Sequence, residues 1–500
     1  MRPLEVALVV AVLVAYLVVM LPPRRSALRA APVVAALAAV GIAVAQAIVE
    51  GTRWQLFPAY AIAGALLLAS LVRLARGTPP LRPPRQWWSR ALSGLAIIAS
   101  VFGLVGASVL PALLPVFSFP APTGPYGIGT VTYHWVDDER DETFTVDPDD
   151  RRELMVQVWY PASPPPGAEP APYIEDADRV APAVAELFDT PSFTLDHLGL
   201  VTTNAVAGAP VASAEPRYPV LVNLSGLGGY RQANTFQIQE LVSHGYVVLG
   251  LDQPYAMARV VFPDGRVADY DHRMDPPHRL PGFDPATAPA HSAFPYAQIP
   301  YLAGDVTFAL DRLAGLDTHD PYGLLTGRLD LARVGLLGQS MGGTVGGTAC
   351  LHEPRVRACL IEDAYLTDEV VLAGLLQPTM WITRDEATML LERRRTGGWP
   401  DAAIAEHASS TRAVFEALPG DGYVVAVQGM FHIELTDAPL FTPLAPALGL
   451  TGPTGATATH EIINAYSLAF FDRHLRDRPA PLLAGPPSPY SQVTLQTRQP

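Results

Sequence analysis

A serine set between glycines is the residue in this chain best suited to covalent chemistry. The segment Val334–Gly343 runs from apolar residues into Gly338-Gln-Ser340-Met-Gly342, and a helical pattern follows through Leu351. Strand, sharp turn and helix in this order are typical of a nucleophile elbow, whose glycines let the strand and the helix approach closely. A turn that merely contains a serine is the alternative interpretation. We predict that Ser340 is a nucleophile.

A serine hydroxyl becomes an effective nucleophile only when a base removes its proton and a third group orients that base. His432 follows the predicted strand Tyr423–Val427 on a loop, where it could reach over the strand ends. His352, His407 and His460 lie in or near helical patterns instead. We therefore predict His432 as the base, with an ordinary surface-loop histidine as the alternative.

Two aspartates compete for the role of the acid that orients the base. Asp363 and Asp385 each follow a predicted strand between Ser340 and His432, and the order serine, acid, histidine suits either one. Glu362 is a weaker third choice, because its side chain would point to the opposite side of the strand from Asp363. Position along the chain leaves the choice between the two aspartates open.

A serine hydrolase also needs two backbone N–H groups that face the charge developing on the substrate oxygen. The residue after the nucleophile, Met341, is the first candidate. The second is Leu227, in the glycine-rich loop Asn223–Tyr230 that follows a predicted strand. A flexible turn would explain the glycines of this loop equally well.

Short apolar strands alternate with helical patterns from residue 130 onward. This alternation predicts an α/β fold, with a mostly parallel sheet covered by helices on both faces and ligands at the carboxyl ends of the strands. We place the domain at residues 130–478, after a linker at 119–129 and before a Pro-rich tail at 479–500 that we expect to be extended or disordered. The predicted strands are Thr130–Val136, Glu153–Tyr160, Tyr218–Leu224, Tyr246–Leu251, Arg333–Leu337, Val356–Ile361, Pro378–Thr383 and Tyr423–Val427; the predicted helices are Gln232–Ser243, Gln298–Ala314, Gly342–Leu351, Asp401–Ala417 and His460–Arg476.

Residues 1–118 contain four apolar runs, each close to or above the length that crosses a membrane as a helix. They predict a transmembrane anchor of four helices. No charged residue or histidine lies deep within a run, and Gln46 is the main polar exception, which favours an anchor over an ion pathway. The runs are Leu4–Leu21, Ala31–Val49, Leu56–Val72 and Ala91–Leu114.

The arginines between these runs predict their orientation. The first connecting loop holds Arg24, Arg25 and Arg29, the second holds only Arg53, and five arginines lie in or beside the third. Arginine-rich loops face the cytoplasm, so the N-terminus and the domain after the fourth run are expected outside it. Because the first arginines follow the first run rather than precede it, we expect this run to be retained and not cleaved as a secretion signal.

Charge and cysteine content exclude several classes of function. Residues 1–118 hold ten Arg against two acids, whereas the rest of the chain holds 24 Arg against 46 acids. The acidic part makes nucleic acid an unsuitable partner, and the absence of lysine excludes Schiff-base and P-loop chemistry. Cys350 and Cys359 lack the spacing of a zinc site; two separate buried thiols are the default expectation, and a disulfide formed outside the cytoplasm is the alternative.

The loop Asp269–His278 contains three aspartates and two histidines, which could suggest a metal site. Their spacing fits no calcium or zinc loop. A solvated lid over the site is the preferred interpretation, so no metal is predicted.

Several segments together resemble the platelet-activating factor acetylhydrolase family, including its lipoprotein-associated phospholipase members. The resemblance extends from about Gly124 to Arg476 and leaves out the apolar runs. The predicted hairpin around Asp264-Gly265 looks more like that of bacterial members. The matching segments are Thr123–Gly129, Arg152–Pro161, Ser225–Arg231, Ser243–Tyr246, Gly338–Gly343, Glu362–Tyr365 and Gly429–His432.

The resemblance implies an α/β-hydrolase in which Asp363, rather than Asp385, is the acid and the amides of Leu227 and Met341 form the oxyanion hole. Ser225 and Gln339 stand where the family often has histidine, a departure that concerns the acyl and headgroup preference.

We expect a membrane-embedded serine esterase, similar to 1-alkyl-2-acetylglycerophosphocholine esterase, that hydrolyses short-acyl phospholipids or related esters through an acyl-enzyme without a cofactor. A broad carboxylesterase or polyester hydrolase is the alternative within enzymes. A catalytically inactive membrane receptor with the same fold is the alternative from another class.

Overall fold

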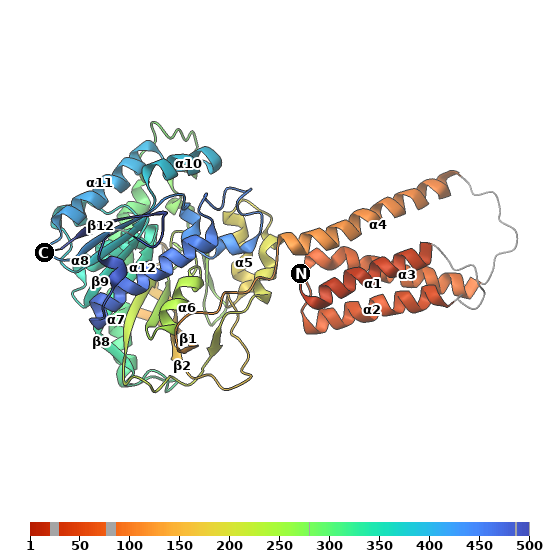
Figure 1. Ribbon diagram of the computed structural model, residues 1–500, viewed down its shortest axis with the longest axis horizontal. Coiled ribbons are helices and arrows are strands. Elements are labelled where there is room, and N and C mark those ends of the chain that lie inside the picture. Colours follow the sequence, from red (N-terminus) through yellow and green to blue (C-terminus); the bar gives the residue numbers. More distant parts are fainter. Residues whose placement is uncertain (21–29, 77–86, 280, 486–487, 500) are drawn as a thin grey trace. The chain divides into compact units, whose positions relative to one another are not determined.

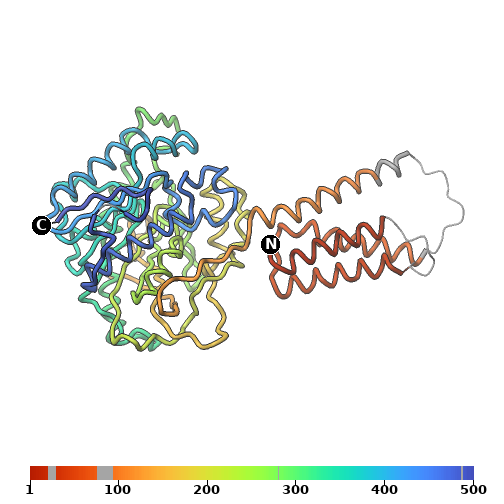
Figure 2. Tube along the Cα trace, viewed as in Figure 1, coloured from red at the N-terminus to blue at the C-terminus, as the bar shows by residue number. Residues whose placement is uncertain are grey.

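The computed structural model describes residues 1–20, 30–76, 87–279, 281–485 and 488–499 (Figures 1 and 2). The chain divides into two compact units. The first comprises Met1–Phe117 with Asp196–Leu200 and Phe441–Pro443, and the second comprises the remaining residues. Each unit is described by itself.

The first unit contains four helices that are long and apolar enough to cross a membrane, as predicted. Their buried faces show the spacing of three and four residues expected for packed helices, as in Leu8, Val12, Ala15 and Val19. Most of the arginines used to predict the orientation lie in segments 21–29 and 77–86, outside the described residues. The helices are α1 (Pro3–Met20), α2 (Ala31–Val49), α3 (Phe57–Arg76) and α4 (Trp87–Leu113).

Charged groups of this unit pair at the ends of its helices. Glu5, in the first turn of α1, is fully buried and lies 3.0 Å from Arg53, which precedes α3. Arg2 contacts the same carboxylate at 2.9 Å. A buried carboxylate needs such partners because the isolated charge would be costly outside water. The pairing fixes the start of α1 against the connection between α2 and α3.

The second unit is built on a sheet of ten described strands in the order β12-β11-β10-β9-β8-β4-β5-β2-β1-β3. The central run from β11 to β5 is parallel, whereas β12 and β2 join its two sides as antiparallel strands. All carboxyl ends of the parallel run therefore meet at one edge. The strands are β1 (Gly127–Asp141), β2 (Arg151–Ala162), β3 (Ala205–Ala207), β4 (Tyr218–Leu224), β5 (Val247–Asp252), β8 (Leu329–Gln339), β9 (Val356–Glu362), β10 (Thr379–Thr383), β11 (Gly422–Val427) and β12 (Val493–Arg498).

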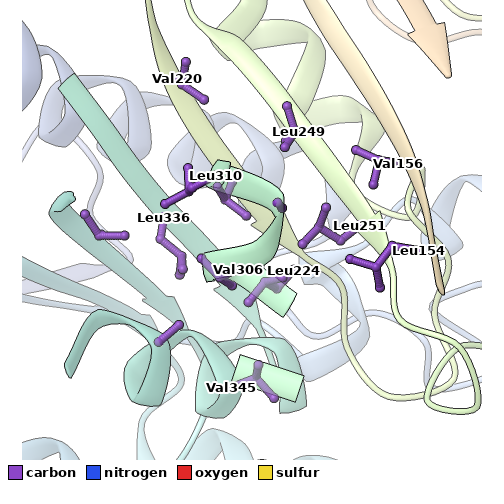
Figure 3. Close-up of a cluster of buried hydrophobic side chains, with 14 of the residues drawn as sticks. Leu154, Val156, Val220, Leu224, Leu249, Leu251, Val306, Leu310, Leu336 and Val345 are labelled. Carbon is purple, nitrogen blue, oxygen red and sulfur yellow. The ribbon is translucent and has the colours of Figure 1, made fainter. Parts of the chain in front are cut away.

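Alternate side chains of the central strands enter different hydrophobic clusters, because successive residues of a strand face opposite sides. Val220 and Leu336 pack with α7 and α8 residues such as Leu310 on one face (Figure 3). Leu221 and Phe471 belong to the cluster on the other face, which α6 and α12 cover. The helices of this unit are α5 (Ala177–Leu187), α6 (Thr235–Ser243), α7 (Ala293–Thr318), α8 (Met341–His352), α9 (Asp368–Ala373), α10 (Glu386–Thr396), α11 (Asp401–Ala417) and α12 (Ala456–Arg476).

The predicted α/β fold is confirmed, and the predicted hairpin is present as β6 (Arg259–Val261) and β7 (Val267–Asp269). Two boundaries were wrong. The linker was expected to reach residue 129, but β1 already begins at Gly127. The domain was expected to end at residue 478, yet Val493–Arg498, within the tail that was expected to be extended or disordered, pairs with β11 as the edge strand β12, because β11 offers an unpaired row of backbone groups on that side.

Cys350 and Cys359 form a disulfide, so the default expectation of separate thiols was wrong. Their sequence separation is nine residues and their Cα atoms lie 6.6 Å apart, because the short connection from α8 to β9 returns the chain to the sheet beside the helix. The bridge joins the helix that follows Ser340 to the strand that precedes Asp363. Such bridges persist in oxidising compartments.

Replacing both cysteines by alanine should destabilise the second unit. Closing a loop of this size contributes about 2.5 kcal/mol through the unfolded state, and the melting temperature should fall by several degrees. Thermal unfolding of the detergent-solubilised chain, compared with wild type under oxidising conditions, measures this. An unchanged melting temperature, or free thiols in denatured unreduced protein, would contradict the bridge.

Candidate active site

Ser340 occupies a strained turn between β8 and α8. Its backbone has φ 56° and ψ −127°, a region that a residue with a side chain rarely adopts. The flanking glycines are required by space: a Cβ on Gly338 would lie 2.3 Å from the Gly342 oxygen, and one on Gly342 would lie 2.2 Å from the Leu224 oxygen. The predicted elbow is therefore present, and Ser340 stands at its tip.

The loops that carry the predicted residues follow one another across the carboxyl edge of the sheet. Neighbouring strands β11, β10, β9, β8 and β4 lead respectively to His432, Asp385, Asp363, Ser340 and Leu227. Two backbone contacts join adjacent loops here. The Ser340 N–H donates to the Glu362 oxygen at 2.8 Å, and the Asp363 N–H donates to the Ile382 oxygen at 2.8 Å.

The structure brings His432 and Asp363 together. Nδ1 of His432 lies 2.5 Å from Oδ2 of Asp363, which leaves the other ring nitrogen available for a second partner. The Asp363 side chain is fully buried and that of His432 is 19% exposed. This is the orientation that a base needs from its acid.

Asp385 does not take this position. Its side chain accepts a hydrogen bond from the Thr388 N–H at 2.7 Å and caps the start of α10. Glu362 points away from Asp363, as expected from strand alternation, and accepts a hydrogen bond from Gln237. Burial raises the pKa of Glu362 to about 8, and the nearby Asp363 charge adds to this effect.

Asp363 stays charged because cationic and polar groups surround it. Burial by itself would raise the pKa of Asp363, but the Arg384 charge and hydrogen bonds from His407 and His432 hold it well below its usual range. Nε of Arg384 donates to Oδ2 at 2.6 Å, and Thr383 Oγ1 donates to Oδ1 at 3.1 Å. An ionised acid at this position can stabilise a protonated imidazole.

The predicted oxyanion loop lies against the elbow. A Cβ on Gly226 would meet the Ser340 Cβ at 3.1 Å, so this loop passes directly beside Ser340. Ser225 donates its hydroxyl to the Tyr230 oxygen at 2.8 Å and closes the loop on itself. Gln339 accepts from Asn234 at 3.1 Å, which ties the elbow to the residue before α6. Ser225 thus braces this loop, and Gln339 braces the elbow.

Sequence reasoning missed Asp437, which joins the segment after His432 to the start of α6. Its carboxylate accepts the N–H groups of Thr235 and Phe236, at 2.8 and 3.0 Å, and the Tyr173 hydroxyl at 3.1 Å. Burial raises the pKa of Asp437 to about 8. The residue occupies the position of a helix cap for α6, although it lies 202 and 201 positions along the chain from the two residues whose N–H groups it accepts, so no local signal could indicate it.

One residue of the predicted lid, His278, interacts with His432. Burial lowers the pKa of His278, and the Arg279 and His432 charges lower it further. The lid carboxylates are occupied by ion pairs, such as Asp269 with Arg259 at 2.5 Å. Among the residues that the structure describes, no group of three or more His, Cys, Asp or Glu side chains could hold a metal ion.

Exchanging each candidate acid for asparagine should separate their roles. Asp363→Asn removes the negative charge that stabilises the protonated imidazole. The rate should therefore fall by roughly 10³ to 10⁴, as expected for the acid of a triad. Asp385→Asn should keep the helix cap and nearly all activity, because asparagine caps helices about as well as aspartate. Hydrolysis of a p-nitrophenyl ester by both variants measures this, and a larger loss for Asp385→Asn would reverse the assignment.

Comparisons with known proteins agree with this fold. No protein-family model matches the chain. A platelet-activating factor acetylhydrolase from Cavia porcellus is 22% identical over 295 residues, which cover 55% of this chain and 62% of that protein, so less than two thirds of the relative is spanned. A ferulic acid esterase from Streptomyces cinnamoneus matches in structure with TM-score 0.58 and 29% identity over 76% of this chain and 100% of that chain. The chain therefore has an α/β-hydrolase fold and resembles the platelet-activating factor acetylhydrolases, as its motifs predicted.

Proposed function

We propose that this protein is a membrane-anchored serine carboxylic-ester hydrolase with Ser340, His432 and Asp363 as its triad. The observation that carries the proposal is the 2.5 Å contact between His432 and Asp363, beside a serine held in a strained elbow. Both relatives described above are named as hydrolases of esters or acetyl groups, which supports the same reaction class.

In this proposal, Ser340 Oγ attacks the ester carbonyl while His432 takes its proton. The negative charge that forms on the carbonyl oxygen is bound by the Leu227 and Met341 N–H groups. The alcohol leaves with the proton from His432, and water then hydrolyses the acyl-serine by the same route in reverse. Asp363 stabilises the protonated imidazole at each stage, and no cofactor enters the reaction.

Short-acyl phospholipids or related lipid esters are the first candidate substrates. The acetylhydrolase relative and the four apolar helices favour them, since a tether would hold the enzyme near membrane lipids. Esters of ferulic acid or a broader range of soluble esters are the second candidate, favoured by the esterase whose whole chain is matched.

A fluorophosphonate probe tests the nucleophile. Wild type should form a covalent adduct on Ser340, detected by mass spectrometry, because the probe reacts with a serine activated by a neighbouring base. Ser340→Ala should form none and should lose all measurable hydrolysis while keeping its melting temperature. Absence of an adduct on the folded wild type would favour the inactive receptor instead.

A substrate panel separates the two candidate classes. We expect kcat/KM for a short-acyl phospholipid to exceed that for methyl ferulate and p-nitrophenyl butyrate by at least about tenfold, a preference worth about 1.4 kcal/mol in the transition state. Ser340→Ala is the control for each substrate. Equal or greater turnover of the soluble esters would remove the lipid preference.

The proposed location is the cell membrane, with the catalytic unit outside the cytoplasm. The arginine distribution and the disulfide favour this orientation. A reporter that is active only outside the cytoplasm, fused after Pro500, should therefore give signal. Activity of a cytoplasm-specific reporter at the same position would refute the orientation.

A further inference from the structure

Arg384 occupies a position that the triad itself does not explain. It is the last residue before Asp385 at the carboxyl end of β10, and its side chain is fully buried. A buried guanidinium requires strong partners, because an unpaired charge in the interior would be very costly. Arg384 has two such partners, Asp363 and Glu392, and each of them also contacts His432.

The first partner is the triad acid. Nε of Arg384 donates to Oδ2 of Asp363 at 2.6 Å, and this is the same oxygen that lies 2.5 Å from Nδ1 of His432. The backbone N–H of Arg384 also approaches Oδ1 at 3.3 Å. Arg384 thus fixes the orientation of the carboxylate that the imidazole contacts.

The second partner holds the main chain of the base. Nη1 of Arg384 donates to Glu392 on α10, and the Glu392 oxygens accept the His432 backbone N–H, both at 3.2 Å. Trp399 completes the arrangement. Its ring centre lies 4.5 Å from the Arg384 guanidinium carbon and 5.1 Å from the centre of the His432 ring, which it meets edge to face.

We propose that Arg384 is a positioning residue that pairs with the charge of the triad acid and fixes both the acid and the backbone of the base in their reactive arrangement. In this arrangement Arg384 acts through its contacts with Asp363 and Glu392. The inference rests on the proposed hydrolase function and extends it to a residue outside the triad.

Several other titratable groups face the Asp363–His432 pair, and the charge of Arg384 must act among them. Glu362 adjoins Asp363 in β9, Glu392 contacts the His432 backbone, and Nε2 of His407 on α11 lies 3.3 Å from Oδ1 of Asp363. His278 interacts with His432 from the lid, and Glu434 lies on the same turn as His432. Arg384 is the cation in direct contact with the shared oxygen.

Removing this cation should change the pH dependence in a defined direction. Without Arg384, Asp363 keeps its proton to higher pH. The positive charge that repels a protonated imidazole is also lost. Both changes favour the inactive, protonated forms of the pair as the pH falls. Arg384→Gln should therefore move the acid limb of kcat/KM upward by about one pH unit and lower kcat roughly ten- to a hundredfold. Arg384→Lys, which keeps the charge but not the two-sided geometry, should keep the limb near its wild-type position while kcat falls.

The matched control is Arg394→Gln, an exposed arginine on α10 that should leave both kcat and the limb unchanged. Glu392→Gln is the second variant in case Arg384→Gln fails to fold. It keeps the Arg384–Asp363 pair, so kcat should fall while the acid limb stays in place or moves to lower pH. An upward shift for Glu392→Gln would overturn the inference.

All variants are measured as full-length, detergent-solubilised protein on p-nitrophenyl acetate, with rates divided by the amount of enzyme that a fluorophosphonate probe labels. The proposal would be overturned if Arg384→Gln had the same kcat and the same acid limb of kcat/KM as Arg394→Gln. It would also be overturned if Arg384→Gln were labelled less but its acid limb did not move, because Arg384 would then only stabilise the fold. Failure of wild type to react with the probe would instead refute the proposed function.

Discussion

The burial of one carboxylate, that of Asp363, is the constraint on which the candidate site depends. A fully buried charge is tolerated only where other groups compensate it, and here Arg384, His407 and His432 all approach the same side chain. These partners come from the end of β10, from α11 and from the loop after β11. Contacts with the single carboxylate of Asp363 therefore hold together segments that are distant along the chain.

Ser340 is held in place by backbone packing rather than by charge. Ser340 is fixed by steric closeness, since the glycines at 338 and 342 permit backbone contacts that no side chain would allow. The disulfide between α8 and β9 then connects the helix behind Ser340 to the strand that ends at Asp363. Backbone packing thus positions Ser340, whereas charge positions Asp363 and His432. Strand β9 takes part in both arrangements.

Much of the fold could be predicted from the sequence because its signals are local. The strand Tyr218–Leu224 and the helix Asp401–Ala417 have the predicted bounds, because the spacing of their apolar residues indicates each element and turn residues mark its ends. β12 was missed because it is only six residues long, contains only two apolar residues, Val493 and Leu495, and follows a Pro-rich stretch, so its apolar signal is weak. The disulfide was missed because the spacing of two cysteines says nothing about the distance between them.

The sequence by itself determined the α/β alternation, the four apolar helices and the candidates Ser340, His432 and Asp363, since each depends on neighbours within a few positions or on a motif. It left Asp363 and Asp385 as rivals until the family resemblance was considered. Only the tertiary structure showed that Asp385 caps α10 while Asp363 contacts His432, that Arg384 and Glu392 hold these two residues, and that Asp437 caps α6. Those contacts join parallel strands and loops far apart in the chain, and the distance between such groups is set by how the sheet assembles, which no local pattern of residues encodes.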